Sequence, residues 1–403
     1  MRSNVKFILT AALASTMLNA QMANAQSPEP IQIGLIAPTS GIYARPGQVM
    51  KMGAEMAIED VNKAGGIACL DGAPLELVTI DSGDTVEKAT NSAQRMVADF
   101  PGLVGATGAY LSSFTLAVSE VTERANLPLL TLSYSDLITS RGFKNIFQTS
   151  ATAGVQAQIA LPIILDLAEQ QTGTRPKTVA IITDNTAASL ASVERMKNGL
   201  LADVGLDLSF EQVFTPPLAD ATSLVQQVRQ TRPDLLFFLP TVISDSKLIL
   251  EKMKEFRVNV PVISFGIAIA EPEVLNTMQA ELLEGVMSAV ANWGTKGQEA
   301  LIQRLNETYG EPWMTQNAIS TYGDIWLFKE ALDKSCSRDR AALGETLRTL
   351  NAGPAKYYPG GTLSFDEQGH REGASLTIIQ WQNGVPVTVY PDDLALAKPV
   401  WPK

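Results

Sequence analysis

The chain has 403 residues, enough for two domains of ordinary size, and 42 acidic against 31 basic residues give it a net charge of −11. This acidity argues against nucleic acid as a partner, because binding to phosphates needs a basic surface. Two cysteines and one histidine cannot supply the four ligands of a structural zinc site, so we expect neither a metal nor a cofactor.

The first 25 residues have the pattern of an export signal. Arg2 and Lys6 precede a mostly apolar stretch, 7–18, that is too short to span a bilayer. Ala23-Asn24-Ala25 is an A-x-A cleavage site, so we expect cleavage after Ala25 and a periplasmic protein. No cysteine follows the apolar stretch, which argues against a lipid anchor.

Strand-like and helix-like patterns alternate along the first third of the chain. This βαβ repetition predicts a parallel sheet with helices on both faces. Strands are expected at 31–36, 75–80, 103–105 and 129–132, and helices near 47–62, 86–99 and 113–124.

A second α/β set follows residue 148. We expect strands at 178–183, 208–213, 235–239, 260–265 and 285–291, and helices near 155–170, 190–203, 221–230 and 244–256. Three more helices are expected near 298–309, 318–334 and 340–350, and then strands at 362–365, 376–381 and 385–390. Asn383-Gly384 is a strong hairpin turn between the last two strands.

These patterns predict an α/β protein of two doubly wound parallel-sheet lobes. Ligands of open parallel sheets bind at the carboxyl ends of the strands, so a cleft between the lobes is the expected site. Enzyme motifs are missing: the chain has no P-loop, no GxGxxG and no GxSxG. The only histidine, His370, lies in a polar turn and is expected to be a solvated loop residue rather than a catalytic base.

Small polar residues follow the strands of the first lobe, in Thr39-Ser40-Gly41, in Gly108–Ser113 and in Ser133-Tyr134-Ser135. Ser112 and Ser113 lie where a helix is expected to begin, and the free N–H groups and dipole of a helix N-terminus favour an anion. The same two serines are equally consistent with plain helix N-caps.

Other residues of these loops have two interpretations. Arg45 is either a surface charge or a clamp for a carboxylate, because its planar fork can bind both oxygens. Tyr43, Tyr110 and Tyr134 are candidates for apolar walls that carry a polar tip.

At this point the chain resembles a known family. The segments 33–41, 53–62 and 65–67 are similar to those of the solute-binding proteins of branched-chain-amino-acid-type ABC importers, the leucine/isoleucine/valine-binding proteins. The similarity continues through 81–85, 180–184, 283–286 and 362–366. It implies the type I periplasmic-binding fold, in which three hinge crossings join two lobes that close on a ligand. The implied boundaries are 26–148 and 289–357 for lobe one, and 149–288 and 358–403 for lobe two.

The resemblance also implies a ligand site. The family's donors to a ligand carboxylate fall on Ser112 or Ser113, Ser133 and Ser135, beside Tyr134. The family acid that binds an α-amino group falls near Ile267, two pocket tyrosines fall at Ala188 and near Thr241, and a further pocket position falls near Asn317. An ammonium group would therefore lack its charge partner, which is costly in a buried site, unless Glu271 or Asp245 fills the role. A small carboxylate-bearing ligand, either an amino acid or an organic or aromatic acid, is expected.

The same family places Cys69 and Cys336 in one lobe, so a disulfide between them is expected; the alternative is two buried free thiols. The implied role is capture of a small molecule by a monomer without catalysis, for delivery to the membrane permease subunits of an ABC importer. A periplasmic sensor that serves a signalling receptor is the alternative.

Overall fold

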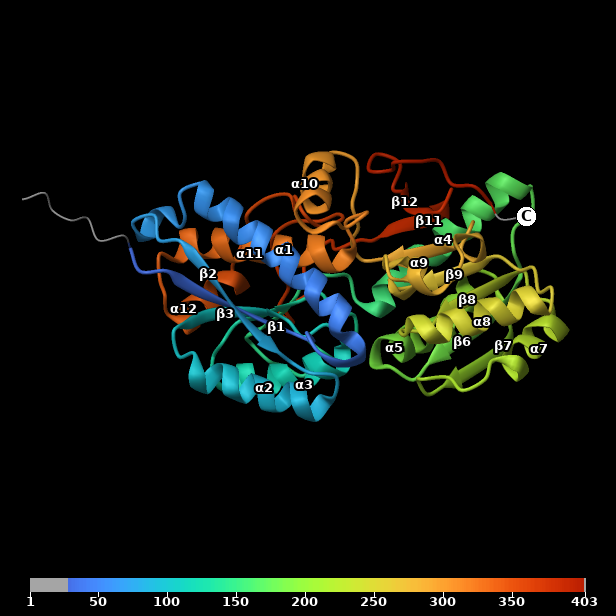
Figure 1. Cartoon of the computed structure of the whole chain (residues 1–403), viewed down its shortest axis with the longest axis horizontal. Helices are drawn as coiled ribbons and strands as arrows, with labels where there is room; N and C mark the ends of the chain where they lie inside the picture. Colours follow the sequence, from blue (N-terminus) through green and yellow to red (C-terminus); the bar gives the residue numbers. More distant parts are fainter. Residues whose placement is uncertain (1–27, 402–403) are drawn as a thin grey trace, which may run out of the picture.

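The computed structural model describes residues 28–401 and contains two α/β lobes that lie side by side (Figure 1). The export signal and its cleavage site lie outside the described residues. The sheet of lobe one is parallel, with strand order β2-β1-β3-β4-β5. Its strands are β1 Ile31–Ala37, β2 Leu75–Asp81, β3 Leu103–Gly108, β4 Leu129–Thr131 and β5 Ile146–Gln148.

Lobe two contains a seven-stranded sheet of order β12-β11-β10-β9-β8-β6-β7. The strands from β10 to β7 are parallel, whereas β11 is antiparallel to β10 and forms a hairpin with β12. The expected turn joins that hairpin, with positive φ at both Asn383 and Gly384. The strands are β6 Thr178–Asp184, β7 Asp207–Phe214, β8 Leu235–Leu239, β9 Val262–Phe265, β10 Met287–Val290, β11 Thr377–Gln382 and β12 Val385–Tyr390.

Helices cover both faces of each sheet, because buried parallel strands expose apolar side chains on both sides. In lobe one, α1, α11 and α12 share one apolar core with the sheet, and α2 and α3 share another. In lobe two, α4 and α5 pack on one face, and α7, α8 and α9 on the other. The helices are α1 Ala44–Lys63, α2 Val86–Asp99, α3 Ser112–Arg124, α4 Ala153–Thr172, α5 Ala187–Arg195, α6 Leu201–Asp203, α7 Thr222–Thr231, α8 Ile243–Glu255, α9 Val274–Thr277, α10 Glu299–Tyr309, α11 Gln316–Ser335 and α12 Arg340–Arg348.

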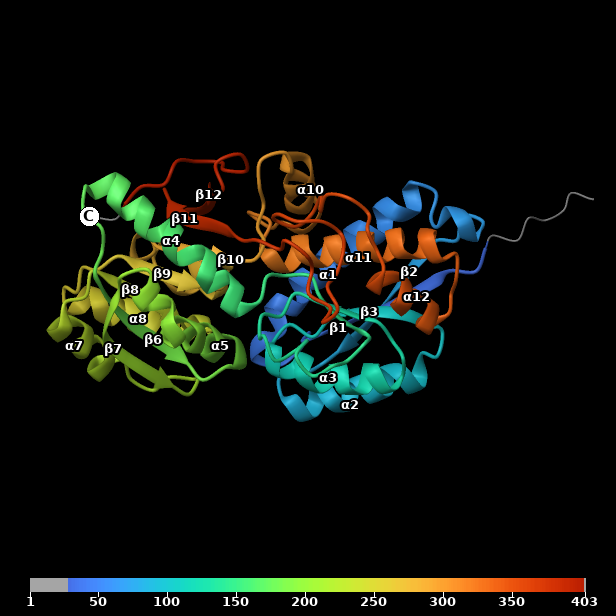
Figure 2. The same cartoon turned by 180° about the vertical axis from the view of Figure 1, so that it is seen from behind.

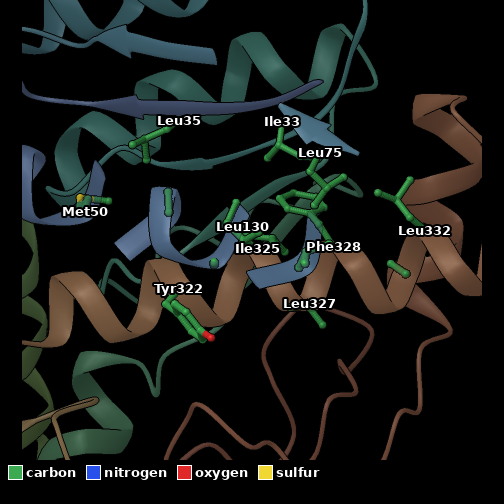
Figure 3. Packing of buried hydrophobic residues seen from close by; sticks show 14 of the residues in the cluster. Ile33, Leu35, Met50, Leu75, Leu130, Tyr322, Ile325, Leu327, Phe328 and Leu332 are labelled. Carbon is green, nitrogen blue, oxygen red and sulfur yellow. The ribbon is translucent and has the colours of Figure 1, made fainter. Parts of the chain in front are cut away.

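The core of lobe one depends on close packing between α1 and α11. Figure 3 shows Ile325, Phe328 and Leu332 of α11 directed toward the sheet, near Ile33 of β1. Gly53 lets the two helices approach, because a Cβ atom there would lie 2.1 Å from the carbonyl oxygen of Ala318. This contact positions the N-terminal end of α11 between the lobes.

The chain passes between the two sheets three times: after β5, after β10 and before β11, as Figure 2 shows from behind. The expected fold of two lobes and three crossings is confirmed. β10 ends at Val290, two residues beyond the expected end of lobe two at 288. The expected lobe boundaries otherwise stay predictions.

A disulfide joins Cys69, in the turn after α1, to Cys336, directly after α11, with a Cα–Cα distance of 5.5 Å. The pair is separated by 267 residues in the sequence. The expected bond is confirmed, and the alternative of two free thiols is wrong.

Three local predictions fail. The helix expected at 190–203 is interrupted after α5, because Gly199 has a φ of 103° that an α-helix cannot contain. Residues 362–365 form only isolated bridges, through Thr362 and Phe365, rather than a strand. His370 is not simply solvated: its side chain is 31% exposed, Nε2 lies 2.5 Å from the Thr139 hydroxyl and Nδ1 lies 3.0 Å from Asp366.

Candidate functional site

A cavity of about 90 Å³ lies between the two lobes, at the carboxyl ends of strands from both sheets. Loops after β3 and β4 line it on the side of lobe one, and loops after β6, β8 and β9 on the side of lobe two. Its lining comprises Tyr110–Ser113, Leu132–Tyr134, Gln156, Thr186–Ser189, Ser192, Pro240, Thr241, Phe265–Ala268 and Gln316.

The structure brings seven of the ten expected ligand-site residues to this cavity: Ser112, Ser113, Ser133, Tyr134, Ala188, Thr241 and Ile267. Arg45, Ser135 and Asn317 are not part of its lining. Sequence reasoning missed the contributions of Gln156 and Ser192, which come from helical positions without a strand-end signal.

The hydroxyls of lobe one differ in their availability. The Ser112 hydroxyl accepts hydrogen bonds from the N–H groups of Tyr134, at 3.2 Å, and Ser135, at 3.1 Å. The Ser133 hydroxyl donates to the carbonyl of Tyr110, at 2.9 Å, and lies 2.6 Å from the hydroxyl of Thr115. These two side chains therefore join the loops that form the wall. The Ser113 hydroxyl has no hydrogen-bond partner among residues 28–401, so it is free to bind a ligand.

The start of α3 is arranged differently from a serine-capped helix. Leu111 is the N-cap residue, and its apolar side chain cannot accept a hydrogen bond from the first turn. Ser112 and Ser113 are the first two helical residues, so the interpretation of these serines as plain N-caps is wrong. The uncapped first turn leaves N–H groups beside the cavity.

Ser135 lies behind the wall rather than in it. Its side chain is fully buried, and its hydroxyl accepts a hydrogen bond from the N–H of Leu137 at 3.3 Å. Sequence spacing could not show that Ser133 lines the cavity and Ser135 does not, because this difference depends on how the loop after β4 turns. Ser135 therefore supports the fold of this loop.

Tyr134 connects the cavity to a hinge crossing. Its hydroxyl donates a hydrogen bond to the side-chain oxygen of Gln316, and the same oxygen accepts one from the N–H of Ala291 at 3.1 Å. Burial raises the pKa of Tyr134, so its phenol stays a neutral donor at physiological pH.

Asp184 organises the loops of lobe two. This fully buried carboxylate accepts hydrogen bonds from the N–H of Thr186, at 3.0 Å, from the hydroxyl of Thr186, at 2.7 Å, and from the N–H of Thr241, at 2.6 Å. One side chain thereby holds together the loops after β6 and β8. An aspartate at the end of a buried apolar strand was the sequence signal that could have identified it.

None of the residues that line the cavity carries a formal charge at neutral pH. The two acids considered as ammonium partners, Glu271 and Asp245, are buried outside the lining. Burial, reinforced by the neighbouring Glu273, raises the pKa of Glu271 to about 8, so the neutral form dominates at pH 7. Burial also raises the pKa of Asp245, whose carboxylate accepts a hydrogen bond from the N–H of Leu218 at 2.9 Å.

Arg45 and Asn317 belong to a contact beside the cavity. The guanidinium of Arg45 pairs with the carboxylates of Glu273 and Glu311, and the side-chain amide of Asn317 donates to Glu271 at 2.8 Å. Arg45 is therefore neither an isolated surface charge nor placed to clamp a ligand in the cavity. The residues that decide this, Glu273 and Glu311, lie more than 200 positions away in the sequence.

Between residues 28 and 401, no helix is both long and apolar enough to cross a membrane. The same residues contain no cluster of three or more His, Cys, Asp or Glu side chains that could hold a metal ion.

Fold and cavity together define a two-lobed α/β protein with an uncharged site between its lobes. The family model described as periplasmic binding protein matches residues 30–385, so the chain belongs to the periplasmic binding protein family. This confirms the resemblance detected in the sequence, and membership implies a periplasmic location. Proteins of this family bind substrates rather than transform them.

Individual relatives agree. Leu/Ile/Val-binding protein homolog 7 of Brucella melitensis is 26% identical over 98% of both chains. A putative branched-chain amino acid ABC transporter protein from Silicibacter pomeroyi has a TM-score of 0.79 at 20% identity, covering 93% of this chain and 99% of its own. LivJ from Streptococcus pneumoniae, a branched-chain amino acid transporter substrate-binding protein solved with isoleucine, has a TM-score of 0.74 at 18% identity and covers 89% and 100%. At these identities, the solved structures support the fold.

Proposed function

We propose that this protein captures a small carboxylate-bearing molecule in the periplasm and delivers it to the membrane permease subunits of an ABC importer. In this proposal the export signal is cleaved after Ala25, and the mature protein acts as a monomer without catalysis. Family membership and the cavity between the lobes support the proposal. Closure of the two lobes around the molecule produces the form that the permease recognises.

One observation carries the carboxylate assignment: two helices from opposite lobes begin at the cavity. Ser112 and Ser113 start α3 on one side, and Ala187 and Ala188 start α5 on the other. Thr186, the N-cap residue of α5, forms no side-chain cap hydrogen bond with its helix. Free N–H groups and the positive ends of two helix dipoles favour an anion without any basic side chain. An anion held by both helices would also stabilise the closed lobes.

The rest of the lining favours a neutral tail. Leu132, Pro240, Phe265 and Ile267 supply apolar surface, and no lining residue offers a negative charge to an ammonium group. Burying an unpaired ammonium costs several kcal/mol in practice. Organic or aromatic acids are therefore the preferred ligands within the class, and amino acids are the alternative.

A thermal-shift screen tests this proposal. The panel pairs leucine, isoleucine and valine with their deaminated analogues, and adds aromatic acids and neutral amides. A ligand at 100 times its Kd stabilises the folded protein by about 2.7 kcal/mol, so true ligands are visible. We expect the deaminated acids to raise Tm at least as much as the parent amino acids. Tight binding of leucine, isoleucine or valine with no response to any deaminated analogue would contradict the assignment.

Delivery to a permease needs a second experiment. In cells that lack this protein, uptake of the radiolabelled ligand should fall, and the wild-type gene should restore it. Unchanged uptake together with tight binding would point instead to a role outside transport.

A further inference from the structure

The lobes are in direct ionic contact beside the cavity. Arg45 lies in the first turn of α1, in lobe one, and its Nε donates to Glu273, which lies between β9 and α9 in lobe two. The same guanidinium donates through Nη2 to Glu311, on the crossing that leads into α11. One arginine therefore connects lobe one, lobe two and a hinge crossing.

Three carboxyl groups surround this one arginine. Glu271 lies two residues before Glu273 and is 2% exposed, and Glu311 is 3% exposed. One oxygen of each of the three acids is buried without a hydrogen-bond partner among the described residues, and so is the side-chain oxygen of Asn317, whose amide donates to Glu271. Buried acceptors without partners are costly, so four in one cluster need an explanation.

Asp324 is a buried carboxylate in the same chain whose two oxygens both have hydrogen-bond donors, and it serves as a comparison. It is fully buried on α11, and its two oxygens accept hydrogen bonds from the hydroxyls of Thr107 and Tyr358. The remaining oxygens of the Glu271 cluster accept no hydrogen bond among the described residues. These acids do not form one of the clusters of three or more ligands that could hold a metal ion, since the described residues contain none.

We propose that the cluster around Arg45 is a proton-loaded latch between the lobes, in which Glu271 carries a proton and donates it to one of the unpartnered oxygens beside it. The proton comes from solvent. The O–H group of Glu271 then forms one hydrogen bond, which gives a partner to its own oxygen and to one acceptor on Glu273, Glu311 or Asn317. The protonated cluster has one negative charge fewer, so Arg45 can hold Glu273 and Glu311 without a third carboxylate repelling them. Deprotonation restores that repulsion and favours separation of α1 from lobe two.

The surroundings of Glu271 are consistent with this role. The charged groups that face Glu271 are Arg45 from α1, Glu273 from its own loop and Glu311 from the crossing. The phenols of Tyr110 and Tyr134 also lie within electrostatic range of Glu271. Burial and the two acids raise the pKa of Glu271 to about 8, and Arg45 opposes them only partly. A glutamate in the unfolded chain has a pKa of about 4.3. Folding and closure therefore both take up this proton.

The direction of the pH effect follows from linkage. The folded state binds the proton more tightly than the unfolded state, so the stabilising effect is complete below about pH 4 and is lost as the pH rises through about 8. In Glu271→Gln the side chain is permanently neutral and can donate through its amide. The variant should therefore lose less stability than the wild type over this range.

The test needs no ligand, so its outcome is independent of the proposed transport function. Tm is measured between pH 5 and 9 for the wild type, Glu271→Gln and Glu281→Gln, which changes an exposed glutamate of the same lobe. We expect the Tm of Glu271→Gln minus that of the wild type to increase steadily from pH 5 to 8 and then level off, while Glu281→Gln follows the wild type. Parallel curves for all three proteins would overturn the proposal.

Small-angle X-ray scattering tests the latch itself. The radius of gyration of the wild type should increase between pH 6 and 9 as the lobes separate, whereas that of Glu271→Gln should stay constant. Arg45→Gln, which removes the bridging cation, should be expanded at both pH values. A wild-type radius that does not change with pH would also overturn the latch.

Discussion

The hydroxyl of Tyr134 donates a hydrogen bond to the side-chain oxygen of Gln316, 182 residues further along the chain. Tyr134 and Gln316 both line the cavity, and Gln316 also accepts a hydrogen bond from the backbone of Ala291, where the second crossing begins. The wall of the site is therefore attached to the hinge. A change in the position of Tyr134 on ligand binding would be transmitted to the segment that moves when the lobes close.

Tyr134→Phe should weaken this connection. The substitution removes one neutral hydrogen bond, worth about 1 kcal/mol, and leaves the Gln316 oxygen with the Ala291 N–H as its partner. We expect a small loss of stability in urea unfolding and a larger loss of ligand affinity, because closure loses a contact. Tyr309→Phe, which removes a hydroxyl bonded to Glu55 away from the cavity, is the control. Equal effects of both variants on affinity would contradict the role of Tyr134.

Ser113→Ala should reduce ligand affinity without altering the fold. Its hydroxyl faces the cavity and has no protein partner between residues 28 and 401, so it is available to a ligand carboxylate. Hydrogen bonds to charged groups contribute about 1.5–3 kcal/mol, which corresponds to a loss of roughly tenfold to a hundredfold in Kd. Isothermal titration calorimetry with the ligand from the screen measures this loss. Ser223→Ala, an exposed serine on α7, should bind as the wild type does.

Ser135→Ala should have the opposite effects, lowering stability while leaving ligand affinity almost unchanged. The buried hydroxyl of Ser135 accepts from the N–H of Leu137 and does not reach the cavity, so its removal leaves a backbone donor unpaired. We expect a loss of about 1–3 kcal/mol in the free energy of unfolding and little change in affinity. Strongly reduced affinity with unchanged stability would instead restore Ser135 to the ligand site.

Asp184→Ala should disrupt the cavity lining, although Asp184 itself is not part of that lining. The carboxylate accepts three hydrogen bonds that hold Thr186 and Thr241, and both residues line the cavity. Removing it leaves two backbone N–H groups without their acceptor, at about 1–3 kcal/mol each. Binding should fall at least tenfold and Tm should drop. Asp184→Asn retains a side-chain oxygen and should recover part of both, which a purely electrostatic role would not allow.

Removal of the disulfide should destabilise lobe one. Replacing both Cys69 and Cys336 with serine releases a bridge across 267 residues, and loss of a native disulfide typically costs about 2–5 kcal/mol. Urea unfolding of the oxidised wild type and the double variant measures the difference. Thiol counting on the denatured, unreduced wild type should find no reactive thiol, and two reactive thiols would show that the bond does not form in solution.

Local patterns in the sequence determined most of the fold. Alternating apolar strands and amphipathic helices predicted both lobes, because burial of one face of each element leaves a period in the sequence that can be read directly. Asn383-Gly384 predicted its hairpin for a similar reason, since few residue pairs accept positive φ at both positions. The expected strand at 362–365 is wrong because Thr362 and Phe365 each form a single bridge, to Pro354 and Arg371, and no continuous ladder with one partner strand results.

The tertiary structure alone decided which candidate side chains reach the cavity. Ser113 and Ser135 are alike in sequence, yet the first faces the cavity and the second is enclosed behind its wall. Arg45 was open to two interpretations because its partners, Glu273 and Glu311, come from distant segments that only folding brings together. The type of each element follows from a hydrophobic period that neighbouring residues display, whereas the charge and hydrogen bonding of a site depend on long-range contacts that leave no period in the sequence.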